Sequence, residues 1–227
     1  MASKDKTASV KNTRSGAELH GDTMASGAKT AGDSLHTRQK VIDAAIACIM
    51  EKGYYKSSSN EVARWAGLSW GVIQYHFGTR ENLMLAVLDD ANKRLIDHMR
   101  ELQIDALTSR SRIQQLFESL VSFYGRAEYL AILEIHLNLI RDPRTSERVR
   151  QEGEIVVEKL KPVYLAVPMD VKNLSMIVDS LRGIIFSHLL RADSHLTMLV
   201  DAEEDFEERS ATLMDALAAY LDSQLPE

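Results

Sequence analysis

Gln74 and its neighbours form the group of side chains in this sequence with the clearest chemistry. A glutamine amide can pair with an adenine edge through two hydrogen bonds, and Gly71 lets the backbone approach a surface closely. Trp70 offers an apolar face to a thymine methyl group, whereas Tyr75 and His76 can reach phosphate oxygens. This combination of residue types is typical of a segment that reads a base sequence.

Residues on either side of this segment could hold phosphates. Hydroxyl residues that cap helices leave backbone N–H groups unpaired at the helix N-terminus, where the helix dipole also attracts anions. Arg80 would add a full positive charge. The same hydroxyls would cap helices in a protein that never binds DNA, so each also has a purely structural interpretation. The predicted DNA-binding residues are Ser57, Ser58, Ser69, Trp70, Gly71, Gln74, Tyr75, His76, Thr79 and Arg80.

Two short helices joined by a turn must position these side chains. Ala63, Gly67 and Ile73 lie four and then six residues apart. They supply a small residue where two helices touch, a residue that tolerates a positive φ in the turn, and a branched residue that pins the second helix. The spacing predicts a helix-turn-helix whose second helix can enter the major groove of DNA.

The rest of the sequence predicts an all-α chain. A first helix is expected from Thr37, as its N-cap, to Gly53, and a fourth helix is expected to follow Thr79. Further helices are expected at 110–124, 126–141, 145–166, 171–192 and 203–224, separated by short polar, glycine or proline breaks. We find no strand pattern, no repeat and no glycine-rich phosphate loop.

Residues 1–34 are rich in Ser, Thr, Gly, Ala and Lys and have no apolar periodicity. This composition predicts a disordered N-terminal extension. A flexible arm that contacts phosphates through its basic residues is the alternative interpretation. The basic residues of this arm are Lys4, Lys6, Lys11, Arg14 and Lys29.

Charge is distributed unevenly along the 227 residues. The net charge of −6 divides into +2 for residues 1–93 and −8 for residues 94–227. Binding to nucleic acid depends on the charge of the contacting face rather than on the total. The distribution is compatible with a DNA-binding head on an acidic body.

Several classes of protein do not fit the composition. Cys48 is the only cysteine, so a disulfide framework is excluded and a reducing, cytoplasmic compartment is expected. No apolar run approaches the length of about 18 residues that indicates a membrane span. The sequence has no paired catalytic carboxylates in a plausible frame and no nucleophile motif, so we expect no enzyme. Its histidines lack metal-ligand spacing, and we expect no metal and no cofactor.

Two helices near the C-terminus carry apolar stripes, with Gly183 permitting a close helix approach in the middle of the first. Paired with a second copy, these stripes would form a four-helix dimer bundle. Alternatively, they close the core of one chain. The candidate dimer residues are Leu174, Ile177, Leu181, Ile184, Ile185, Leu213, Leu217 and Tyr220.

A ligand cavity in this body would lie among the helices that cover residues 94–190. Aromatic and aliphatic residues at helical spacing are more often core than pocket, so this assignment competes with simple packing. Their types suggest an apolar ligand with few polar anchors. The candidate ligand-binding residues are Phe117, Val121, Tyr124, Leu133, His136, Leu137, Ile140, Tyr164 and Phe186.

The runs TRQKVIDAAIACIMEKGYYKSS and EVARWAGLSWGVIQYHFGTRENLMLAVL together resemble the N-terminal domain of the TetR family of bacterial transcriptional repressors. The Gly-Tyr pair, the Ala-Gly-Leu-Ser turn, the Tyr-His-Phe end of the reading helix and the basic residue three positions after Phe77 all correspond in order. The resemblance covers roughly residues 36–90. Beyond them, the chain is similar to the family only in being helical and of suitable length.

This resemblance implies a homodimer that binds a palindromic double-stranded DNA operator and is released by a small effector. It implies a helix-turn-helix domain at residues 35–82 and a helical effector-binding and dimerisation domain at residues 83–227. It also carries roles in DNA binding to Ser57, Ser58, Tyr75, His76 and Arg80. A DNA-binding activator or an architectural protein without an effector is the alternative function.

Three residues depart from the family pattern. Trp70 stands where lysine is usual, Gln74 where an aromatic residue is common, and Ser59 where an apolar core residue is usual. Trp70 would replace a phosphate contact with an apolar base contact, and Gln74 would shift specificity toward a hydrogen-bonded base. The operator sequence therefore cannot be carried over from the family.

Overall fold

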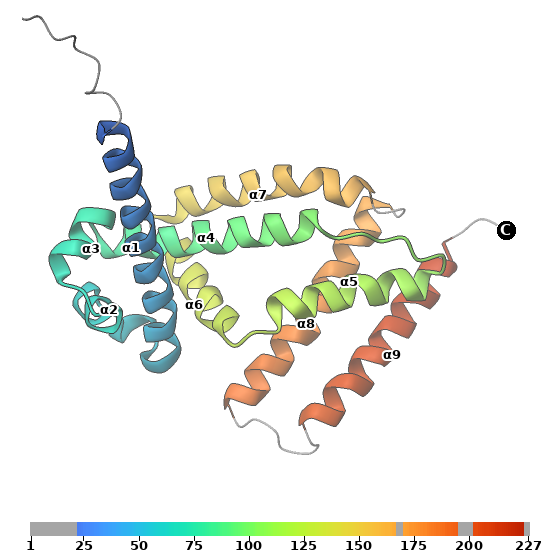
Figure 1. Ribbon diagram of the computed structural model, residues 1–227. Coiled ribbons are helices and arrows are strands. Elements are labelled where there is room, and N and C mark those ends of the chain that lie inside the picture. Colours follow the sequence, from blue (N-terminus) through green and yellow to red (C-terminus); the bar gives the residue numbers. More distant parts are fainter. Residues whose placement is uncertain (1–21, 167–169, 195–201, 225–227) are drawn as a thin grey trace, which may run out of the picture. The chain divides into compact units, whose positions relative to one another are not determined.

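A computed structural model describes residues 22–166, 170–194 and 202–224 of the chain (Figure 1). The regular structure of these residues is helical throughout, so the predicted all-α class is confirmed. The chain divides into two units, residues 1–39 and residues 40–227. The elements are α1 (Asp22–Lys52), the 3-10 helix η1 (Tyr54–Lys56), α2 (Ser59–Ala66), α3 (Trp70–Phe77), α4 (Arg80–Arg100), α5 (Ser109–Tyr124), α6 (Glu128–Arg141), α7 (Ser146–Ala166), α8 (Val171–Ser194) and α9 (Ala202–Asp222).

Helix α1 begins 15 residues before the predicted N-cap, Thr37. The Thr37 hydroxyl donates to the carbonyl oxygen of Asp33 at 2.8 Å, the bond that a threonine inside a helix makes with the preceding turn. Residues 22–34 thus belong to α1, whereas their composition predicted an extension without regular structure. Their alanines favour helix without producing an apolar stripe, so periodicity could not reveal them. Residues 1–21, with most of the proposed basic arm, lie outside the described residues.

The turn between α2 and α3 has the predicted geometry. Gly67 has a φ of 63° and its N–H donates to the carbonyl oxygen of Arg64, which ends α2. Ala63 and Ile73 are both buried in one apolar cluster, and α2 contacts α3, as the spacing required. The helix-turn-helix predicted from three residues is therefore present.

A single apolar core underlies this motif and continues into the following helices. It joins Ile42 and Ile49 of α1 to Leu83 and Val87 of α4. Buried residues of α6, such as Ile135, belong to the same cluster. Because one close-packed core spans these helices, a displacement of α4 or α6 transmits strain to the helix-turn-helix.

The C-terminal helices form a second core, in which α5 packs against both α8 and α9 (Figure 1). Most of the predicted dimer residues belong to it. Leu174, Ile177, Leu181, Ile185 and Leu217 are buried inside the chain. Their stripes close the core of one chain, which corrects their assignment as contacts to a second copy. The apolar stripes predicted that these residues are buried, but not whether a second copy or the chain's own helices bury them.

The same helices expose a different face. Met176, Gly183 and Leu190, at seven-residue intervals on α8, are exposed. On α9, Ala216 and Tyr220 are exposed as well. Ile184 and Leu213 are half-buried at the edge of the core.

Candidate nucleic-acid interface and ligand cavity

Helix α3 presents the predicted reading residues on its outer side. Ile73 and Phe77 are buried beneath it, which turns Trp70, Gln74 and Tyr75 outward. Half of Trp70 and 82% of Tyr75 are accessible. Two large aromatic side chains exposed on one short helix form the kind of apolar patch that marks a binding surface.

Gly71 is also exposed, and a Cβ added to it would lie 3.7 Å from the Ser69 hydroxyl oxygen. The local backbone therefore does not require glycine at position 71. The missing side chain of Gly71 instead suits the close approach of an external group to the backbone. The His76 ring is half-buried and packs edge-on against Tyr75 with 5.0 Å between ring centroids.

Helix caps lie on both sides of α3. The Ser58 hydroxyl accepts from the backbone N–H of Glu61 at the start of α2, and the Thr79 hydroxyl accepts from that of Asn82 at the start of α4. Ser69 is the N-cap of α3, and its hydroxyl makes no capping hydrogen bond. These termini supply N–H groups that could hold phosphates.

Ser57 differs from the other predicted hydroxyl residues. It is fully buried, and its hydroxyl donates to the carbonyl oxygen of Gly53 at 2.9 Å. Ser58, and not Ser57, is the cap of α2. The Ser57 side chain thus stabilises the turn between α1 and α2 and is not exposed to a phosphate.

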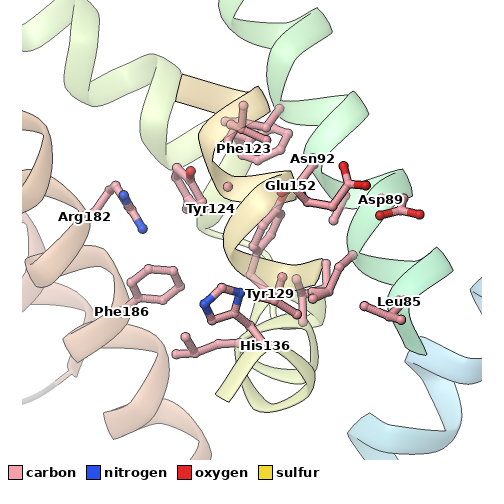
Figure 2. A pocket seen from close by; sticks show the side chains of 18 residues that line it. Leu85, Asp89, Asn92, Phe123, Tyr124, Tyr129, His136, Glu152, Arg182 and Phe186 are labelled. Carbon is pink, nitrogen blue, oxygen red and sulfur yellow. The ribbon is translucent and has the colours of Figure 1, made fainter. Parts of the chain in front are cut away.

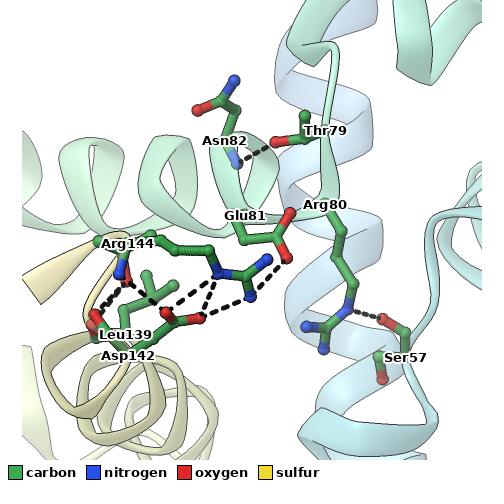
Figure 3. A network of polar contacts seen from close by, with 9 residues as sticks. Ser57, Thr79, Arg80, Glu81, Asn82, Leu139, Asp142 and Arg144 are labelled. Carbon is green, nitrogen blue, oxygen red and sulfur yellow. Dashed lines mark hydrogen bonds and ion pairs between the residues drawn. The ribbon is translucent and has the colours of Figure 1, made fainter.

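Arg80 is directed into the protein (Figure 3). Its Nε donates to the carbonyl oxygen of Ser57 at 2.9 Å, one terminal nitrogen donates to the carbonyl oxygen of Tyr54, and the guanidinium lies 4.1 Å from the centre of the Tyr54 ring. The sequence predicted a phosphate contact for this side chain. In the structure it ties the start of α4 to η1 instead.

Glu61 is held between two cations on α1 and α2. It pairs with Lys52 and with Arg64, whose side-chain hydrogen bonds lower the pKa of the Glu61 carboxyl to about 2. Trp65 donates to the same carboxylate at 3.3 Å. At physiological pH the Glu61 carboxylate is therefore ionised, and the two cations offset its negative charge. It adds little repulsion to an approaching phosphate backbone.

Two contacts join α6 and the loop after it to the elements around the helix-turn-helix. A Glu134 carboxylate oxygen on α6 accepts from the backbone N–H of Tyr54 at 3.0 Å. Arg144, between α6 and α7, pairs with Asp142 at 2.7 Å and with Glu81 in the first turn of α4 at 3.2 Å (Figure 3). Neither contact could be predicted from sequence patterns, because Glu134 and Tyr54 are 80 residues apart and Arg144 lies far along the chain from Glu81.

A cavity of about 280 Å³ lies among α4, α5, α6, α7 and α8. Figure 2 shows its lining, with Arg182 and Phe186 of α8 facing His136 of α6. The lining residues are Leu85, Leu88, Asp89, Ala91, Asn92, Leu95, Phe123, Tyr124, Tyr129, Ile132, Leu133, His136, Val149, Glu152, Gly153, Val156, Arg182 and Phe186.

Four of the predicted ligand-binding residues line this cavity: Tyr124, Leu133, His136 and Phe186. The other five do not. Phe117, Val121 and Tyr164 pack in or against the C-terminal core, Ile140 packs against the core under the helix-turn-helix, and Leu137 is exposed. Helical periodicity identified apolar faces but could not tell which turn of each helix borders the cavity.

The lining is more polar than the sequence suggested. Asp89, Asn92 and Glu152 lie on the side of α4 and α7, whereas Arg182 projects from α8 (Figure 2). Arg182 lies 5.2 Å from the centre of the Tyr124 ring. A single arginine within an apolar stripe was the available sequence signal for this site, and it was missed.

Burial alters the titration of the groups around Arg182. Desolvation lowers the pKa of His136 below its usual value, and the Arg182 charge lowers it further. Desolvation also raises the pKa of the Tyr124 and Tyr129 hydroxyls. At neutral pH the cavity therefore contains a neutral imidazole, neutral phenols and a guanidinium cation.

Within the described residues, no helix has the length and apolar character required to cross a membrane. The same residues contain no group of three or more histidine, cysteine or carboxylate side chains that could hold a metal ion.

Comparisons with known proteins identify the N-terminal helices. Residues 41–87 match the family model described as bacterial regulatory proteins, tetR family. The transcriptional regulator CymR of Pseudomonas putida is 25% identical over 169 residues, which cover 70% of this chain and 83% of CymR. The fatty acid metabolism regulator protein of Bacillus subtilis is matched over about half of its length, 48%, at 26% identity. These relatives are transcriptional regulators and not enzymes.

Solved structures extend the similarity to the whole fold. The multidrug binding protein EbrR complexed with imidazole is 26% identical, with a TM-score of 0.55 over 84% of this chain and 96% of EbrR. The regulator FadR of Bacillus subtilis in complex with stearoyl-CoA is 18% identical, with a TM-score of 0.59 over 80% of this chain and 97% of FadR. The FadR comparison shows the shared fold alone.

Proposed function

Because the chain belongs to the TetR family of bacterial transcriptional regulators, we propose that it is a cytoplasmic repressor controlled by a small effector. It binds a palindromic double-stranded DNA operator as a homodimer, with one α3 in each half-site. The effector binds in the cavity among α4 to α8 and releases the DNA. The complexes of EbrR with imidazole and of FadR with stearoyl-CoA support a ligand site in this fold.

One observation carries this proposal: the helix that lines the cavity also begins at the helix-turn-helix. Leu85, Leu88 and Asn92 of α4 border the cavity, and Arg80 at the N-terminus of α4 is bonded to η1. A ligand against the middle of α4 therefore contacts an element that is attached to the reading head. A DNA-binding protein without an effector would need no such cavity beside this helix.

The effector acts by favouring a state in which the two reading helices no longer fit the DNA. Successive half-sites on one face of B-DNA are about 34 Å apart, so a displacement of α4 and α6 misplaces one α3 relative to the other. A ligand produces this change only by binding the DNA-incompetent state more tightly. An affinity ratio of order 10² corresponds to about 2.7 kcal/mol of coupling.

The dimer forms through the exposed face of α8 and α9. The small residues Gly183 and Ala216 on this face would let two pairs of helices approach closely, with Met176 and Tyr220 adding apolar contact area. A Cβ added to Gly183 meets no atom of the described residues of one chain within 4 Å. A larger residue there is thus compatible with the monomer but not with a close dimer.

The change Gly183→Leu is expected to convert the dimer into a folded monomer. Leucine favours helix over glycine by up to about 1 kcal/mol, so the monomer itself should be no less stable. Sedimentation velocity measures the oligomeric state, and circular dichroism measures the helix content. The control is Gly153→Leu on α7, which also has open space around the added Cβ and should stay dimeric. A Gly183→Leu protein that remains a dimer contradicts this interface.

The change Gln74→Ala is expected to relax base preference at one position of each half-site. A bidentate amide contact contributes about 1–3 kcal/mol of discrimination, so affinity for the operator should fall about 5- to 150-fold while affinity for unrelated DNA stays constant. Fluorescence anisotropy on operators with every single base-pair substitution measures this preference. If the variant keeps the base preference of the unaltered protein at all positions, Gln74 does not read a base.

Footprinting tests the proposed function as a whole. The purified protein is incubated with the DNA upstream of its own gene, and candidate metabolites are then added. We expect a protected palindrome that is released by a small molecule. Protection without release by any compound favours a regulator or architectural protein that has no effector, and a lack of protection contradicts autoregulation. A promoter–reporter fusion distinguishes repression from activation.

A further inference from the structure

We propose that the effector is a small planar carboxylate whose acidic group binds Arg182 and whose ring lies among the aromatic side chains of the cavity. This inference rests on the proposed function, because it assigns the chemical class of the ligand for that same cavity.

Among the described residues, not every N–H donor of Arg182 has a hydrogen-bond acceptor. Its Nε is shielded from solvent and has no hydrogen-bond partner there, and its ion pair with the exposed Asp179 is long, at 3.8 Å. The Arg182 side chain as a whole is 41% accessible, and its shielded Nε–H is the donor whose missing acceptor is unfavourable. A carboxylate supplies two acceptors in the planar geometry that matches a guanidinium fork.

The environment around the guanidinium is suited to an anion. Figure 2 shows Arg182 extending from α8 toward Tyr124 and His136. The Tyr124 hydroxyl stays protonated, because burial raises its pKa, and can donate a hydrogen bond. The imidazole of His136 is neutral at physiological pH and provides one further donor.

The acidic residues of the cavity do not oppose this assignment. Asp89 pairs with Arg148 at 3.3 Å, so its charge is offset within the protein. Glu152 and Asn92 lie on the opposite side of the cavity from Arg182 (Figure 2). They can accept hydrogen bonds from a hydroxyl or amino group at the far end of the ligand.

Size and shape select a small planar molecule. The cavity of about 280 Å³ lies just below the range of roughly 300–1,000 Å³ found for sites of drug-sized ligands. Aromatic rings surround it, with Tyr124 and Phe186 at a centroid distance of 5.7 Å and Phe123 and Tyr129 at 4.8 Å. Edge-to-face and offset contacts with these rings favour a flat, unsaturated ligand body.

Three probes of nearly equal size and different charge test the inference. Sodium benzoate, benzamide and benzylammonium chloride are titrated into the full chain by isothermal calorimetry, without DNA. We expect benzoate to bind at least about 10-fold more tightly than benzamide, since a hydrogen bond between charged groups is worth more than a neutral one. Benzylammonium should not bind measurably.

The change Arg182→Met should lower benzoate affinity about 10- to 100-fold and change benzamide affinity little. Lys172→Gln, which removes a charge from an exposed position of the same helix, is the control and should leave benzoate affinity unchanged. Thermal unfolding verifies that both variants fold. Preferential binding of benzylammonium, equal or absent binding of all three probes, or benzoate affinity within twofold of normal in Arg182→Met overturns the inference.

Because these titrations contain no DNA, they separate the inference from the proposed function. If benzoate binds through Arg182 but never releases the operator, the ligand class stands and effector control fails. If the operator is released only by cations or neutral compounds, effector control stands and the ligand class is wrong.

Discussion

Replacement of Arg80 by methionine is expected to abolish specific DNA binding and to lower the free energy of unfolding by about 2–4 kcal/mol. The guanidinium bonds two backbone carbonyl oxygens, those of Tyr54 and Ser57, and packs on the Tyr54 ring. Methionine fills part of the volume but leaves both carbonyl groups without their donor. The start of α4 then loses its attachment to η1, and α2 and α3 are no longer held in one orientation.

Lysine at position 80 distinguishes this role from a phosphate contact. If Arg80 contacted a phosphate, Arg80→Lys would retain most of the affinity, and Arg80→Met would reduce the slope of log K against log salt concentration by about 0.9 per protomer, or about 1.8 for the dimer. If Arg80 acts as the structure indicates, lysine cannot form the same two-carbonyl contact, and both variants lose binding. Lys56→Gln, an exposed change in η1 itself, controls for simple loss of charge.

Anisotropy titrations at several salt concentrations and urea unfolding measure the two effects. An Arg80→Met protein with normal stability and a reduced salt slope would restore the phosphate interpretation and contradict the structural one.

Helices α5 to α9 could be predicted from the sequence to within a few residues, because each has an apolar stripe and ends at a glycine, proline or polar break. The N-terminal part of α1 could not, since its alanines stabilise helix without marking a buried face. Local signals thus predict an element well when that element also packs against a core.

Sequence patterns could not predict the roles of side chains whose partners are distant in the sequence or are backbone groups. Arg80 fits a motif position for DNA contact, but its partners are carbonyl groups at residues 54 and 57, which no side-chain pattern encodes. Arg182 is one cation in an apolar stripe, and only the helices across the cavity show that it faces aromatic rings. The outward side of α3 could be predicted from the sequence, because Ile73 and Phe77 mark the inner side of the helix.

Removal of the Glu134 carboxylate is expected to weaken the control of DNA binding by the effector. Leu133 and His136, on the same helix, line the cavity, and Glu134 accepts from the backbone N–H of Tyr54. Tyr54 in turn bonds Arg80 through its carbonyl oxygen. A ligand that shifts α6 therefore acts on η1 and on the start of α4 through Glu134, in parallel with its direct contact with α4.

Glu134→Ala leaves the direct contact between the ligand and α4 intact and removes the hydrogen bond that links α6 to η1. If both contacts contribute comparably to a coupling of about 2.7 kcal/mol, the effector should change DNA affinity about 10-fold in the variant instead of about 100-fold. Affinity for the effector in the absence of DNA should stay within about threefold of normal, because Glu134 does not line the cavity.

The coupling is measured as the ratio of operator affinities with and without a saturating compound, using benzoate or whichever compound releases the footprint. Glu128→Ala, in the first turn of α6, is the matched control, because Glu128 pairs with Arg126 just before the helix. Linkage requires that DNA change the affinity for the effector by the same factor, so a second titration in the reverse order checks the value independently. A ratio that is unchanged in Glu134→Ala would show that the hydrogen bond between Glu134 and Tyr54 does not carry the signal. In that case the hydrogen bond to Tyr54 only stabilises the turn between α1 and α2.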